Sequence, residues 1–230
     1  MWTRSVRSRV SSISNVQQGD EIMKMKIESY CVGPVQTNCY FAIHEDTGEL
    51  FAVDPGAEGD RLTTQIERSG YHPKAILLTH GHFDHAGAAA QLAAHFQIPV
   101  YAHEKERETL SDPARNVCGM MGKQEVYHAD QYVKDEQQLV IAGFTIRVLF
   151  TPGHTSGGCC YYIPKEDVLF SGDTLFAGSV GRTDFPGGSM SAIVASIREK
   201  LMVLPEQTAV YPGHMDCTTI EEERRNNPYL

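Results

Sequence analysis

The feature that most constrains this chain is a run of metal-binding residue types within six positions: His80, His82, Asp84 and His85. Side chains two apart in extended backbone project the same way, so His80 and His82 can hold one metal ion. Asp84 and His85 come next and can reach a second position. A surface cluster of polar residues is the ordinary alternative, but so many imidazoles packed together repel one another when protonated. The run therefore predicts a metal centre.

Three other segments offer ligands that this run lacks. His154, Asp173 and His214 each follow a strand-like run, which is where a rigid scaffold presents functional side chains. A Pro-Gly turn precedes each of the two histidines. One Pro-Gly-His tripeptide is more often only a turn, but two of them and a Gly-Asp, all after strands, make a joint signal. We expect the remaining histidines to be surface or core residues: His44, His72, His95, His103 and His128.

From Met25 onward, short strand-like runs alternate with helical patterns, and strands dominate both halves of the chain. This pattern weakly implies two sheets packed face to face with helices outside. We expect helices at 59–69, 86–96, 190–204 and 218–225. We expect strands at 26–31, 38–44, 50–53, 74–78, 99–102, 158–163, 168–170 and 209–211, and a hairpin over 139–151. No repeat or interior linker interrupts residues 25–230, which we expect to form one domain.

Composition excludes several classes of protein. The net charge of −9 argues against binding to nucleic acid, and no apolar run approaches the roughly 20 residues of a membrane helix. The six cysteines have no CxxC spacing, and Cys159 and Cys160 are adjacent, which favours free thiols in a reducing compartment. We therefore expect a cytoplasmic protein. Its oligomeric state is not readable from the sequence.

Residues 1–24 have a different composition. Arg4, Arg7 and Arg9 stand among serines, and no acidic residue precedes Asp20, which is typical of an organellar transit peptide. The alternative is an extension upstream of the folded chain, because Met23 and Met25 stand where the patterned sequence begins. In either case we expect a poorly ordered N-terminal extension.

The metal-binding segments, taken in order, resemble the motifs of the metallo-β-lactamase superfamily. They are His80-Gly-His82-Phe-Asp84-His85, Thr151-Pro-Gly-His154-Thr155, Gly172-Asp173-Thr174 and Gly213-His214. The resemblance extends from about Lys26 to Leu230 and implies an α/β fold, the four-layer αββα metallo-β-lactamase sandwich. Residues 172–176 and 181–185 are most similar to the glyoxalase II group, the hydroxyacylglutathione hydrolases. The closing segments, residues 218–221 and 227–230, are similar to the short single-domain members of that group.

The resemblance also implies a role for each ligand. His80, His82 and His154 would bind a first metal, Asp84, His85 and His214 a second, and Asp173 would bridge both. Asp84 and Asp173 are thus the candidate catalytic carboxylates. The cofactors would be two divalent ions, with zinc favoured and iron or manganese also suited to nitrogen and oxygen ligands. Asp54 would hydrogen-bond a ligand histidine, although an Asp-Pro-Gly turn residue is an equal alternative.

The implied reaction is hydrolysis of a small-molecule thioester. A water bridging two dications has its pKa lowered to about 7, and a leaving thiolate needs little help from an acid because its own pKa is about 8.5. Arg182 matches a cation that contacts glutathione in this group and is a candidate carboxylate clamp, with an ordinary surface arginine as the alternative. Full-length glyoxalase II has a C-terminal helical domain with more glutathione contacts. Only 16 residues follow His214 here, which leaves other thioesters open.

Other functions remain open. Persulfide dioxygenases also resemble this chain, carry a similar segment at 181–185, and would use His80, His154 and Asp173 to hold a single iron. The full second ligand set favours a hydrolase over that reading. A lactonase or phosphodiesterase is a further alternative, although no phosphate-handling motif is evident. A non-enzymatic metal-binding protein is disfavoured, because storage would not explain an open two-metal site.

Overall fold

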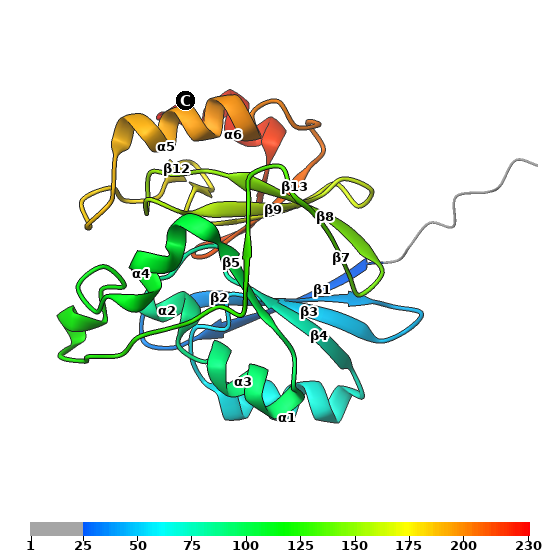
Figure 1. Ribbon diagram of the computed structural model, residues 1–230. Helices are drawn as coiled ribbons and strands as arrows, with labels where there is room; N and C mark the ends of the chain where they lie inside the picture. The colour runs from blue at the N-terminus through cyan, green and yellow to red at the C-terminus, as the bar shows by residue number, and fades with distance from the viewer. Residues whose placement is uncertain (1–24) are drawn as a thin grey trace, which may run out of the picture.

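Two sheets packed face to face form the centre of the molecule, and helices cover the outer side of each (Figure 1). The structure is a computed structural model that describes residues 25–230, so the predictions for residues 1–24 lie outside the described residues. The four layers confirm the predicted αββα sandwich. Two layers of sheet suit this sequence because each sheet must bury one face on the other and one face under helices.

The first sheet contains the N-terminal half of the chain. Its strands, in spatial order, are β1 (Met25–Val32), β2 (Thr37–His44), β3 (Glu49–Val53), β4 (His72–Leu77), β5 (Val100–His103) and β6 (Gln131–Val133). The first three are antiparallel, and β3 to β6 run parallel. Helices α1 (Gly59–Ser69) and α3 (Ala89–Phe96) cover its outer face (Figure 1). Parallel strands end at the same edge, so the loops after β3 and β4 meet.

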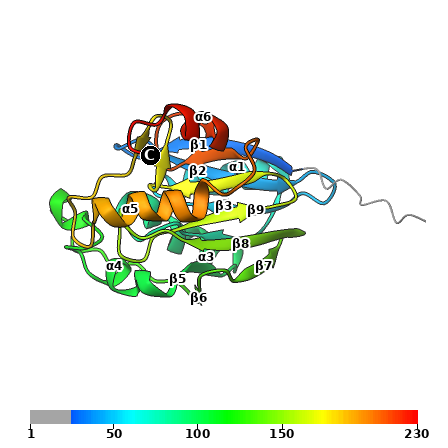
Figure 2. The same ribbon diagram turned by 90° about the horizontal axis from the view of Figure 1, so that it is seen from above.

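The second sheet contains the C-terminal half. Its spatial order is β14 (Thr218–Thr219), β13 (Ala209–Pro212), β10 (Val168–Gly172), β9 (Cys159–Ile163), β8 (Phe144–Phe150) and β7 (Gln138–Ile141). A small pair, β11 (Leu175–Phe176) and β12 (Ser179–Val180), lies beside it. Helices α5 (Met190–Ser196) and α6 (Ile220–Asn226) lie across its outer face, as Figure 2 shows. Short helical segments occupy 104–106, 107–111 (α4), 118–121 and 197–201.

Aromatic side chains join the two sheets. The Phe51 ring of β3 lies 6.1 Å from that of Phe144 on β8 and 6.0 Å from that of Phe170 on β10, both edge to face. All three are fully buried, and such pairs stabilise beyond the area that they bury. The packed interior fixes the sheets relative to each other, and therefore fixes the loops that leave their common edge.

The predicted helix 86–96 is wrong in one respect, because it is interrupted. A one-turn helix, α2 (Phe83–Ala86), ends at Gly87, and α3 begins only at Ala89. The turn that follows β3 presses against the break. A Cβ on Gly87 would lie 2.4 Å from the carbonyl oxygen of Gly56, and the amide of Ala88 donates to the carbonyl of Pro55 at 2.9 Å. The interruption brings this turn against α2.

Two other helix boundaries differ from the prediction by two residues or more. The helix expected at 190–204 ends at Leu201 after a wider π turn over Ile197–Leu201. Thr218 and Thr219 form a strand instead of the first turn of the last helix, and the Thr219 hydroxyl caps that helix by accepting from the amide of Glu222. All six cysteines are free, as predicted. In the described part of the chain, residues 25–230, no helix combines the length and apolar character of a membrane span.

Candidate metal centre

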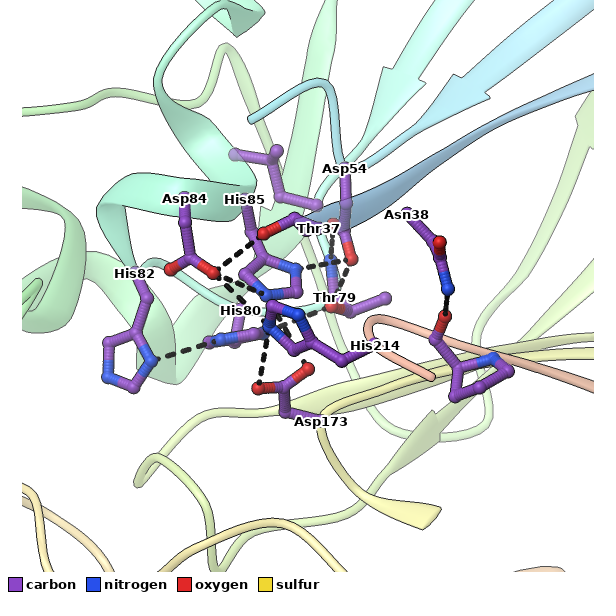
Figure 3. A network of polar contacts seen from close by, with 12 residues as sticks. Thr37, Asn38, Asp54, Thr79, His80, His82, Asp84, His85, Asp173 and His214 are labelled. Carbon is purple, nitrogen blue, oxygen red and sulfur yellow. Dashed lines mark hydrogen bonds and ion pairs between the residues drawn. The ribbon is translucent and has the colours of Figure 1, made fainter. Parts of the chain in front are cut away.

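The predicted ligands converge from loops far apart in sequence, and Figure 3 shows all of them except His154. His80 and His82 follow β4, Asp84 and His85 lie on α2, and the loops after β8, β10 and β13 carry the remaining three: His154, Asp173 and His214. None of the other five histidines joins a possible metal-binding group within residues 25–230. Both halves of the chain therefore contribute to the same site.

Three imidazoles form the first group. His82 Nδ1 lies 3.1 Å from His80 Nε2 and 3.0 Å from His154 Nε2, and all three side chains are buried. Burial, together with repulsion from neighbouring imidazoles, holds the pKa of His80 and His82 well below the usual range, and burial also lowers the pKa of His154. Neutral imidazoles offer lone pairs. Nitrogens bound at 2.0–2.1 Å to one tetrahedral ion lie roughly 3.3 Å apart, so this group could hold a divalent ion.

The second group is richer in carboxylate. Asp84 Oδ2 lies 3.4 Å from His85 Nε2 and 3.2 Å from His214 Nε2. Burial opposes the charging of His85, but the carboxylates of Asp84, Asp173 and Asp54 outweigh it and raise the pKa of His85 well above its usual value. His85 Nε2 is buried and has no hydrogen-bond partner. A cation bound here would satisfy that nitrogen and would balance the carboxylates.

Asp173 lies between the two groups. Its Oδ1 is 3.4 Å from His85 Nε2, and its Oδ2 is 3.5 Å from His154 Nε2. Oδ1 is buried and accepts no hydrogen bond. The backbone of Gly213 approaches closely, since a Cβ there would lie 2.3 Å from Asp173 Oδ1 and 2.6 Å from His85 Cε1. The glycine of this Pro-Gly-His segment thus leaves the room that the carboxylate needs, and the donor set fits two divalent ions.

Neighbouring groups orient the imidazoles. Asp54 Oδ2 accepts from His85 Nδ1 at 2.9 Å, and the backbone carbonyl of Arg182 accepts from His154 Nδ1 at 2.7 Å. Each contact consumes Nδ1 and leaves Nε2 free for the site, the usual way in which a ligand tautomer is fixed. Asp54 is itself held by the amide and hydroxyl of Thr79, at 2.8 and 2.6 Å. Its φ of 50° is uncommon outside glycine and marks a constrained position.

Two supporting residues were missed by the sequence analysis. Glu106 is fully buried; one carboxylate oxygen accepts from the amide of Gly81 at 3.1 Å, and the other accepts from the amide of Gly157 at 2.9 Å and from the Thr155 hydroxyl. It therefore ties the His80–His82 loop to the loop that carries His154. Thr37 donates to Asp84 Oδ2 at 2.8 Å. Neither residue belongs to a sequence motif, so only the fold reveals them.

Arg182 lies at the rim with its charge already paired. Its Nε and Nη2 each donate to the Asp184 carboxylate at 2.7 Å, and its guanidinium lies 4.0 Å from the centre of the Phe185 ring. Both Arg182 and Asp184 are exposed. Arg182 lines a cavity of about 510 Å³ whose floor includes members of both candidate ligand groups, among them His82 and Asp84. A cavity of this size can accept a small molecule.

A family model for the metallo-β-lactamase superfamily matches residues 32–214. Two similar curated proteins are a probable metallo-hydrolase, YqgX, of Bacillus subtilis, and the hydroxyacylglutathione hydrolase GloC of Haemophilus influenzae. The first is 43% identical over 90% of this chain and 98% of its own length. The second is 37% identical over 90% of this chain and 98% of its own length.

Solved structures show the same similarity. The BLEG-1 B3 metallo-β-lactamase superposes with a TM-score of 0.85 at 44% identity, over 89% of this chain and 99% of its own. TTHA1623 in a di-iron-bound form superposes with a TM-score of 0.75 at 36% identity, over 88% of this chain and 100% of its own. ETHE1 from Myxococcus xanthus superposes with a TM-score of 0.74 at 28% identity, over 89% of this chain and 84% of its own.

Proposed function

Because this chain belongs to the metallo-β-lactamase superfamily and is a metal-dependent hydrolase, we propose that it hydrolyses thioesters, as a hydroxyacylglutathione hydrolase does. The observation that carries the proposal is the position of Asp173, whose carboxylate oxygens lie 3.4 to 3.6 Å from histidine nitrogens of both ligand groups. The 37% identity to GloC supports the choice of thioesters.

The proposed ligand assignment follows the two groups. His80, His82 and His154 would hold the first ion, Asp84, His85 and His214 the second, and Asp173 would contact both. Zinc is our first choice, and iron or manganese accepts the same nitrogen and oxygen donors. Two such ions would supply a hydroxide at neutral pH and would polarise a carbonyl oxygen.

The residues of the chain perform the other tasks. The hydrogen bonds from His85 to Asp54 and from His154 to the Arg182 carbonyl keep the imidazoles in place. The titratable side chains that line the cavity in the described part of the chain are the ligand candidates and Arg182: His82, Asp84, His154, Asp173, Arg182 and His214. Apart from the candidate ligands and Arg182, no described titratable side chain that lines the cavity could donate a proton to a leaving group. A thioester tolerates this, because a thiolate with a pKa of about 8.5 leaves without one, whereas an amide would need a proton.

A mono-iron persulfide dioxygenase is the second candidate, because residues 181–185 resemble a segment of those enzymes. Such an enzyme needs one metal position, and His80, His154 and Asp173 would supply it. The second ligand group would then have no role. Its buried and unpartnered His85 Nε2 therefore favours the hydrolase.

Assays on one metal-loaded preparation test the proposal. We expect hydrolysis of S-D-lactoylglutathione or another thioester, without oxygen uptake when glutathione persulfide is supplied. A lactone, a phosphodiester and a β-lactam complete the panel. Oxygen uptake on the persulfide without hydrolysis of any thioester would replace the hydrolase with the dioxygenase.

A further inference from the structure

The wall of the cavity differs in chemistry from its floor. Above the ligands the lining is almost entirely apolar, and includes Val35, Val117, Met120, Met121, Phe176 and Phe185. The polar side chains of the described residues that line it away from the floor are only Ser179 and Arg182. A substrate that reaches the ligands must therefore place its outer part against apolar atoms.

Apolar side chains are also exposed around the mouth. Met120 is 68% exposed, Met121 53%, Met215 59% and Val35 43%. A single exposed apolar residue is ordinary, but a group of them around one cavity is typical of a binding site. Methionine suits this role, because its unbranched thioether adapts to ligands of different shape. A ligand in the cavity would cover apolar area of these four residues.

The segment that carries Met120 and Met121, residues 118–121, is held in place by a strained residue. Val117, just before it, is buried and has a φ of 55°, which is rare for a β-branched residue. Asn116 fixes the segment. Its side-chain amide donates to the backbone carbonyl of Glu125 at 2.9 Å, and its backbone carbonyl accepts from the backbone amide of Phe83 at 2.9 Å. Phe83 immediately precedes Asp84. Strain of this kind persists where the surroundings enforce it, commonly at ligand sites, and here it places the wall against the second ligand group.

The charges around the cavity suit polar substrates poorly. The one arginine or lysine that lines it within residues 25–230 is Arg182, and Asp184 already takes two of its hydrogen bonds. Lys123, which lines a neighbouring pocket, is paired with Glu125 at 3.1 Å. Glutathione carries two carboxylates, and each would have to displace one of these partners. An aliphatic chain would displace only water.

We propose that this wall binds the aliphatic acyl chain of the substrate, so that thioesters of medium-chain carboxylic acids are better substrates than S-D-lactoylglutathione. The proposal rests on the proposed thioester hydrolysis and names its substrate class. The acyl carbonyl would lie over the ligand groups, and the chain would lie along the 117–121 segment toward Phe176.

A series of acyl thioesters on one uncharged thiol tests this. With N-acetylcysteamine thioesters from acetyl to octanoyl, we expect kcat/KM of the metal-loaded protein to rise about fourfold per methylene buried, equivalent to about 0.8 kcal/mol. The Met120→Ser, Met121→Ser double variant should flatten that rise. Met190→Ser is the matched control, because Met190 is also an exposed methionine, on α5, and does not line this cavity.

Binding of the product carboxylates, acetate to octanoate, measured by calorimetry, separates the two proposals. If no thioester is hydrolysed but affinity rises with chain length and falls in the double variant, thioester hydrolysis fails and the apolar site stands. If thioesters are hydrolysed at rates independent of chain length, or S-D-lactoylglutathione exceeds all of them, the acyl-chain site is overturned and thioester hydrolysis stands. If there is no hydrolysis and affinity is independent of chain length, both are overturned.

Discussion

The two ligand groups differ in charge, burial and support. The first has three buried imidazoles whose pKa values are lowered, and the second has a carboxylate and two imidazoles whose pKa values are raised. His80 and His82 are 2% exposed, whereas the side chain of His214 is 24% exposed. Because His214 leaves the second group partly open to solvent, we expect an ion there to exchange more readily than one in the first group. The difference matters because a hydrolase of the proposed kind needs both positions, and a mono-iron oxygenase needs only the first.

Removing a ligand from the first group has the largest expected effect. His82→Ala should lose one ion per chain and lower kcat by about 10³-fold or more, since a catalytic ion contributes several kcal/mol. Metal content by mass spectrometry and thioester hydrolysis measure both. His128→Ala, a change at an exposed histidine outside the site, is the control. A His82 variant that keeps two ions and full activity would contradict the assignment.

Removing a ligand from the second group separates hydrolase from oxygenase. We expect Asp84→Ala to retain the first ion, to lose the second, and to lower hydrolysis about 10²-fold or more. Metal content and kcat of the purified variant check this. Asp46→Ala, a carboxylate change in the exposed turn after β2, is the control. Unchanged activity with one ion per chain would show that the second position has no catalytic role.

Glu106 supports only the first group, through Gly81, Gly157 and Thr155. In Glu106→Gln one oxygen becomes an amide donor that must face a backbone N–H or the Thr155 hydroxyl, so the two loops lose their common acceptor. We expect affinity at the first position to fall about 10- to 100-fold, with a smaller change at the second. Stepwise cobalt titration followed by absorption resolves the two positions. Equal weakening of both would assign Glu106 a general role in stability.

Asp54 is the counterpart at the second group. Asp54→Asn keeps the shape of the side chain but removes the charge opposite His85 Nδ1, and can leave the imidazole in the wrong tautomer. The same titration should show a loss of about 10-fold at the second position. Asp60→Asn, at an exposed aspartate on α1, is the control. A loss of metal affinity confined to the first position would show that Asp54 supports the first ligand group instead of the second.

Arg182 should have the smallest effect, because its side chain contacts neither group and its charge is paired with Asp184. An exposed pair of this kind contributes about 1 kcal/mol at most, so we expect Arg182→Ala to raise KM for S-D-lactoylglutathione up to about fivefold and to leave kcat unchanged. Steady-state kinetics provide the measurement. Arg225→Ala, which breaks an exposed pair with Glu221, is the control. An unchanged KM would remove Arg182 from the substrate site.

The sequence predicted the features that depend on local pattern. The periodicity of Leu62 and Ile66 and the stop at Gly70 placed α1 correctly, because a helix is determined largely by nearby residues. The ligand residues stood out because Pro-Gly turns and aspartates directly followed strand-like runs. Such signals need no knowledge of distant contacts.

Features that depend on tertiary contacts were not predictable. The break at Gly87 arises because a turn more than 30 positions earlier packs against the helix. Glu106 carries no local mark of its role, since its partners lie 25 to 51 positions away. In the sequence, Arg182 and Asp184 are only two nearby charges. Their two hydrogen bonds depend on the backbone conformation of the loop that carries them.

Metal titration of the metal-free protein tests the central claim most directly. The rate of thioester hydrolysis is measured after each addition of zinc, with bound metal counted in the same samples. A two-metal hydrolase predicts that the rate stays low up to one ion per chain and reaches its maximum at two. A maximal rate at one ion per chain, or an activity that appears only with one iron and consumes oxygen, would contradict it.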